Sequence, residues 1–253
     1  MSLDSFRGLI ALIACLVPFL LVQRWLHRQI QAVFLLITRR PALSLGLFSL
    51  IFFPGVLLHE VSHYLMARLL RVRTGRFSLI PTLLENGQLQ LGFVETARVD
   101  YVRDALIGMA PLLTGGLAIA YLGIRRLGLV SLAGLAAGGD WAAFWFSLRA
   151  VPQLPDFWLW FYLAFTISST MLPSASDRQA WLPLVLTIVA LAAAALLAGA
   201  GPWMLANLAP RLDQGLRVLA TVFGISLALH LALSLPVGLS AHLLSRLTGM
   251  KVV

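Results

Sequence analysis

The chain has 253 residues, of which 60% are hydrophobic and only 11% are charged, and its mean hydropathy is +0.90. Because so few charges cannot cover a soluble domain of this length, the composition excludes the soluble globular class and predicts an integral membrane protein. The formal net charge is +9, and the basic residues stand mostly at the ends of apolar runs. Arginines at such positions anchor helices in the lipid bilayer, so no nucleic-acid partner is expected.

Six apolar runs are long enough to cross a hydrocarbon core, which takes about 20 helical residues. In chain order they cover roughly 8–24, 42–67, 105–124, 157–173, 182–200 and 218–244. Because a spanning segment must satisfy its own backbone hydrogen bonds, all six are predicted to be helices. Residues 25–40 mix arginines and a histidine with apolar positions, which predicts an interfacial amphipathic helix. The expected fold is therefore an all-α polytopic membrane protein with a single membrane domain, 1–253.

Two segments differ from this pattern. The Gly- and Ala-rich stretch 129–150 is a candidate for a re-entrant or surface-lying piece. The polar interval 71–104 contains the turn dipeptide Asn86-Gly87, followed by alternating Gln88–Leu91. With Phe77–Ile80 as its partner strand, this interval predicts a small β-hairpin at the membrane surface. The helices of 182–253 have no assigned role.

The second predicted span contains the motif His59-Glu60-Val61-Ser62-His63. On a helix, residues four apart lie on the same face, so His59 and His63 can present their imidazoles to one metal ion. Glu60 lies within reach of a water molecule at the open position of that metal. Because Cys15 is the only cysteine, a thiolate cluster is excluded. The motif therefore predicts a Zn²⁺ site with Glu60 as the catalytic base.

A catalytic zinc site needs a third protein ligand, for which the sequence offers three candidates. Asp177 follows an apolar span that Pro173 should break, and it is the first choice. Asp140, inside an apolar segment, is the rival, and His230 in the last span is a further accessory candidate. For Asp177 to meet the histidines, the spans that carry them must run in the same direction. Only one of the two intervening segments, 105–124 and 129–150, should then cross completely.

With these residues in view, the chain resembles the site-2 protease family of intramembrane metalloproteases. The resemblance covers about 42–177: the HEVSH helix, the polar hairpin, the helix that opens with Gly108-Met109-Ala110-Pro111, and a helix running into a proline and an aspartate. It implies that this core binds zinc through His59, His63 and Asp177 and uses Glu60 as the general base. It also implies that the hairpin region presents the substrate as an added strand.

The expected function is therefore that of an intramembrane zinc endopeptidase that cleaves membrane-embedded segments of other proteins. The expected location is the cell (inner) membrane of a prokaryote. Two alternatives stay open: an ion-binding transporter whose acidic and histidine residues hold an ion in transit, and a catalytically inactive scaffold of the same fold.

Overall fold

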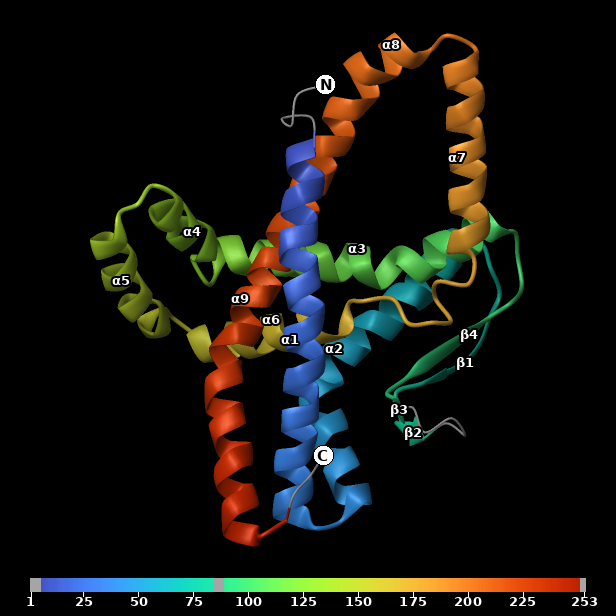
Figure 1. Cartoon of the computed structure of the whole chain (residues 1–253). Helices are drawn as coiled ribbons and strands as arrows, with labels where there is room; N and C mark the ends of the chain where they lie inside the picture. Colours follow the sequence, from blue (N-terminus) through green and yellow to red (C-terminus); the bar gives the residue numbers. More distant parts are fainter. Residues whose placement is uncertain (1–5, 84–88, 251–253) are drawn as a thin grey trace.

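The computed structural model describes residues 6–83 and 89–250, and it is mainly helical (Figure 1). In chain order its elements are α1 (Arg7–Thr38), α2 (Pro41–Leu69), β1 (Thr74–Ser78), β2 (Thr82–Leu83), β3 (Leu89–Gln90), β4 (Phe93–Thr96), α3 (Tyr101–Arg125), α4 (Leu129–Ala137), α5 (Trp141–Ala150), α6 (Phe157–Thr170), α7 (Trp181–Leu197), α8 (Gly201–Trp203) and α9 (Ala209–Thr248). A π-helical stretch, Met204–Leu208, joins α8 to α9.

Four helical stretches are long and apolar enough to cross a membrane: α1, α2, α3 and the continuous stretch Gly201–Thr248. The expected spans at 157–173 and 182–200 are the shorter helices α6 and α7, with 14 and 17 residues. Both fall below the length of about 20 residues that a straight crossing requires. The composition and the four long helices together identify an integral membrane protein.

The predicted interfacial helix at 25–40 is wrong, because these residues continue α1 without interruption to Thr38. Leu26 and Ile30 are buried against α2, so one face of this half of α1 packs inside the protein. The helix also runs beside α9 and parallel to it (Figure 1): Gly8 contacts Asp213 near one end, and Trp25 contacts Gly238 further along. Packing against α2 and α9 explains why α1 continues through residues 25–38 and does not end at the membrane surface.

The segment 129–150 does not form one crossing helix. It folds into α4 and α5, with nine and ten residues, which are joined at Gly138-Gly139-Asp140. Gly139 has φ +74°, a conformation that ends α4 and that side chains other than glycine rarely adopt. At about 1.5 Å per residue neither helix reaches across a core about 30 Å thick, as expected for a re-entrant or surface-lying piece.

The polar interval forms an antiparallel ribbon, but its predicted pairing is wrong. Phe77 pairs with Val94 in the β1–β4 sheet, whereas Gln90 pairs with Thr82 in the β2–β3 sheet. Phe77–Ile80 therefore does not pair with Gln88–Leu91. The predicted turn Asn86-Gly87 lies outside the described residues. Pro81 separates β1 from β2, and because proline has no N–H to donate, it interrupts the ladder there.

The helices that position the functional site are α2, α3 and α6. The Tyr162 hydroxyl on α6 donates to the Ile51 carbonyl oxygen at 2.8 Å, and Gly55, one turn further along α2, lies against Thr166. The contacts advance in the same order along both helices, so α2 and α6 run in the same direction, as the sequence predicted. Gly115 of α3 lies against Met171, and Gly108 against Asp177, so α3 runs the opposite way to α6. The C-terminal ends of α2 and α6 thus meet near the start of α3.

Candidate metal centre

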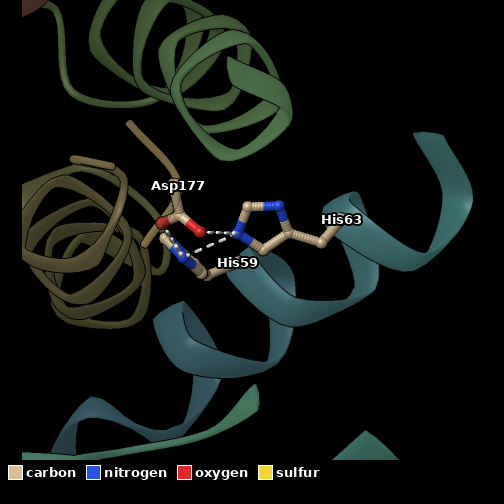
Figure 2. Close-up of side chains that lie close together, drawn as sticks. All are labelled: His59, His63 and Asp177. Atoms are coloured by element: carbon tan, nitrogen blue, oxygen red, sulfur yellow. Dashed lines mark hydrogen bonds and ion pairs between the residues drawn. The ribbon is translucent and has the colours of Figure 1, made fainter. Parts of the chain in front are cut away.

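Three of the predicted ligands converge at this meeting point. His59 and His63 come from α2, and Asp177 comes from the loop after α6; their side chains point toward one another in Figure 2. The two Nε2 atoms are 3.1 Å apart, and Asp177 approaches His63 Nε2 to 3.4 Å and His59 Nε2 to 3.7 Å. The three side chains are 8–15% exposed. The site is therefore largely shielded, yet open to a small ion or water.

The outer nitrogen of each histidine is fixed by a backbone carbonyl. His59 Nδ1 lies 2.7 Å from the Thr170 carbonyl oxygen, and His63 Nδ1 lies 2.9 Å from that of Ile107. A carbonyl oxygen only accepts hydrogen bonds, so both Nδ1 atoms must donate. In neutral imidazoles the lone pairs are then on Nε2, directed at the centre of the cluster. Hydrogen bonds of this kind to the outer ring nitrogen accompany metal-binding histidines in general.

The centre of the cluster therefore holds two nitrogen lone pairs and a carboxylate, which are three acceptors facing one another. Three acceptors at 3.1–3.7 Å repel each other unless a cation lies between them. In tetrahedral zinc sites with bonds of about 2.0–2.1 Å, neighbouring ligand atoms lie about 3.3–3.4 Å apart. The observed distances bracket that value, so the three residues fit a zinc ion with one position left for water or substrate.

Asp177 is held in place by its own loop and by α3. The Ser174 N–H donates to its carboxylate at 2.7 Å. This hydrogen bond from a backbone N–H favours the ionised form of the carboxyl. Gly108 lies directly against the Asp177 carbonyl, where no Cβ would fit.

A glycine also brings α6 close enough to fix His59. Gly55 lies one helical turn before His59 on the same face of α2, and a Cβ there would overlap the Thr166 carbonyl of α6. The absence of a side chain allows the two helices to approach closely, as small residues do at membrane-helix interfaces. This approach places the Thr170 carbonyl, at the end of α6, within hydrogen-bonding distance of His59.

Glu60 is buried beside the cluster, in the wall of a cavity of about 1060 Å³. His59, His63 and Asp177 line the same cavity, together with the extended segment 90–98. Gly92 in this segment is so close that a Cβ there would lie 2.9 Å from Glu60 Cγ. The cavity therefore brings together an acidic side chain, the three candidate ligands and an extended stretch of backbone.

The two rival ligands lie elsewhere. Asp140 is the N-cap of α5, where its carboxylate accepts the Ala143 N–H at 3.0 Å. His230 is fully buried on α9 and bridges to α6: its Nδ1 donates to the Ser226 carbonyl, and its Nε2 lies 3.0 Å from Ser169 Oγ. Neither lines the cavity. His230 therefore joins two helices through a hydrogen bond, which is the common role of a lone histidine among membrane helices.

Sequence reasoning missed the groups that support the ligands: the carbonyls of Thr170 and Ile107, the glycines Gly55 and Gly92, and the contact of Gly108 with the Asp177 loop. A backbone carbonyl leaves no mark in the sequence, so the first two carry no signal. Gly55 does carry one, because a glycine four residues before His59 lies on the metal-binding face and indicates a close helix contact.

Comparison of the chain with models of protein families, with curated proteins and with solved structures gives no match. The function of the site must therefore be inferred from its own chemistry.

Proposed function

We propose that the protein is an intramembrane zinc endopeptidase of the site-2 protease type. The observation that carries this proposal is the convergence of His59, His63 and Asp177 in one cavity with the buried carboxylate of Glu60. Two histidines four residues apart, with a glutamate after the first, are the arrangement that metallopeptidases use on a helix. Zinc is the ion that suits two imidazoles and a carboxylate, and when bound it supplies Lewis acidity for water activation and carbonyl polarisation.

The residues of the chain divide the remaining work. His59, His63 and Asp177 hold the ion, and the carbonyls of Thr170 and Ile107 keep the imidazoles in the tautomer that exposes Nε2. Glu60 takes a proton from the attacking water as the new C–O bond forms. It then gives that proton to the amide nitrogen as the C–N bond breaks, which leaves a carboxylic acid and an amine.

The substrate class follows from the cavity wall. β4 pairs with β1 along one edge, and among the described residues no strand pairs with its other edge. The residues of β4 line the cavity, so an extended segment of a membrane protein would add to β4 as a further strand. A helical substrate must unwind before its peptide bonds are accessible, and strand addition replaces the hydrogen bonds that unwinding breaks. We assign the protein to the inner membrane of a prokaryote and its substrates to the same bilayer.

The direct test is cleavage of a labelled single-span polypeptide by the purified, zinc-supplemented protein in detergent, followed by mass spectrometry. Glu60→Gln is the matched variant, because it keeps the shape of the side chain and removes its basicity. We expect cleavage by the parent and a rate lower by about 10²–10⁴-fold in Glu60→Gln, with an unchanged zinc content. Equal rates in the two proteins would rule out Glu60 as the base. Zinc binding without cleavage of any of a panel of such polypeptides would favour the inactive scaffold.

A further inference from the structure

The cavity has a second polar wall, distant in sequence from the metal centre. Gln23, His27 and Gln31 of α1 line it together with the metal-binding residues. They are spaced four residues apart, so they form a row along one face of the helix. The adjoining wall on α2 is apolar and includes Phe48 and Phe52, which both contact the His27 ring. The amide groups of this row offer hydrogen bonds to a polar ligand in the cavity.

The protein itself provides few partners for this row. Gln23 donates its side-chain amide to the Ser169 carbonyl at 2.7 Å. His27 packs edge-on against Phe52, and its Nε2 is buried with no hydrogen-bond partner. The side chain of Gln31 makes no hydrogen bond to any described residue and is exposed at the end of the row. The Gln31 amide is therefore open to a ligand, whereas Gln23 already uses one amide N–H and His27 Nε2 is enclosed by its neighbours.

The spacing of the row matches the edge of an extended peptide. Residues four apart on a helix are about 6 Å apart along its axis. Along one edge of a strand, outward-facing peptide groups recur every second residue, about 6.6–6.8 Å. Gln23 and Gln31, about 12 Å apart along the helix axis, therefore match two peptide groups about 13 Å apart on one edge of a strand. The glutamine amide carries a donor and an acceptor, as a peptide group does.

An extended substrate needs such a second wall. Pairing with β4 satisfies the N–H and C=O groups on one edge of the added strand and leaves those on the other edge unpaired. In a site shielded from water these unpaired groups are costly. We propose that the amide groups of Gln23 and Gln31 bind the backbone on the free edge of the substrate strand and so hold the unwound segment across the metal centre. This inference rests on the proposed peptidase function and adds to it a set of residues that position the substrate independently of its side chains.

The test is peptide binding to the Glu60→Gln protein, which is expected to hold zinc and peptide without rapid cleavage. The probe is a fluorescein-labelled decapeptide rich in valine and leucine, titrated in detergent and followed by fluorescence anisotropy. Gln31→Met removes the amide at nearly constant volume. Gln29→Met is the matched control, because Gln29 lies on the same helix but lines a different pocket, near His242. Each variant is also measured for zinc content, which reports whether the metal centre is intact.

We expect Gln31→Met to weaken binding about threefold to tenfold, which is the loss of one hydrogen bond, and Gln29→Met to leave it unchanged. A set of peptides methylated at single backbone nitrogens identifies the interaction. At one position, methylation should weaken binding to the parent but add nothing in Gln31→Met, because both changes remove the same contact.

Three results would overturn the inference. Equal affinities of the parent and Gln31→Met, with normal binding of the peptide, would contradict it while leaving the peptidase proposal intact. A loss in Gln31→Met that adds to the effect of methylation at every position would show that the row acts on water and not on the peptide backbone. Failure of the parent to bind any such peptide, with zinc present, would instead contradict the proposed function itself.

Discussion

Replacing Gly92 by alanine should disable the base and spare the metal. A Cβ at this position would lie 2.9 Å from Glu60 Cγ and 3.0 Å from the Ser78 carbonyl oxygen. Ordinary contacts between carbon atoms are about 3.5–4.0 Å, so something must move by about 0.6–1 Å. The Ser78 carbonyl belongs to the backbone of β1 and cannot turn aside, whereas the side chain of Glu60 can. Because the three atoms nearest to the new methyl group belong to Glu60 and Ser78 and to none of the ligands, zinc binding should persist.

A displacement of 1 Å in a catalytic group can lower a rate about 10²-fold, so we expect Gly92→Ala to cleave the single-span probe about 10–100 times more slowly than the parent. The assay pairs that rate with the zinc content of the same preparation. Gly46→Ala is the control, because no atom lies within 4 Å of a Cβ at that position. Cleavage by Gly92→Ala at the parent rate would refute the assignment of Glu60 as a base confined by this strand.

Three further substitutions separate the metal centre from its surroundings. Gly108→Ala should push the Asp177 loop away and weaken zinc affinity about 10–100-fold in a competition titration with a chelator. Gly46→Ala, which has open space around it, should leave the zinc affinity unchanged. Unchanged affinity in Gly108→Ala would mean that Asp177 does not depend on this contact. Asp140→Ala should cost about 1 kcal/mol through loss of the α5 N-cap and keep the zinc; loss of zinc would restore Asp140 as a ligand. His230→Leu should leave the Ser169 hydroxyl unpaired and lower stability by about 1–3 kcal/mol, seen as a lower melting temperature, again with zinc retained; a variant that melts like the parent would show that the bridge between α9 and α6 contributes little.

The part of the site on α2 could be predicted because a helix fixes the relation between neighbouring residues. Once His59 and His63 lie on a helix, their shared face follows from its period alone. Asp177 required more, because its position depends on how α2, α3 and α6 pack. The structure brings Asp177 to the two histidines, and α2 and α6 run in the same direction, which is the condition that the prediction set for this meeting. The end of α6 could be predicted from Pro173, because the residue before a proline disfavours the helical conformation, and the helix stops at Thr170.

The errors arose where long-range contacts decide the outcome. The charged half of α1 has the pattern of an interfacial helix, but burial of Leu26 and Ile30 against α2 makes it part of the core. The ribbon has a clear turn signal at Asn86-Gly87, but a turn sets the register only of the residues next to it. The partner of Phe77, which precedes Pro81, depends on the path that the returning strand takes past Glu60. Nothing in the local sequence encodes that path.

The central claim is that His59, His63 and Asp177 together hold one zinc ion, and the zinc content of the detergent-purified protein tests it most directly. The parent, His59→Ala and Asp177→Ala are purified side by side and their metal is measured by mass spectrometry, with helicity and melting temperature as checks of folding. The account predicts about one zinc per parent chain and loss of that zinc in both variants. A folded parent without zinc, or an Asp177→Ala variant that binds zinc as tightly as the parent, would contradict it.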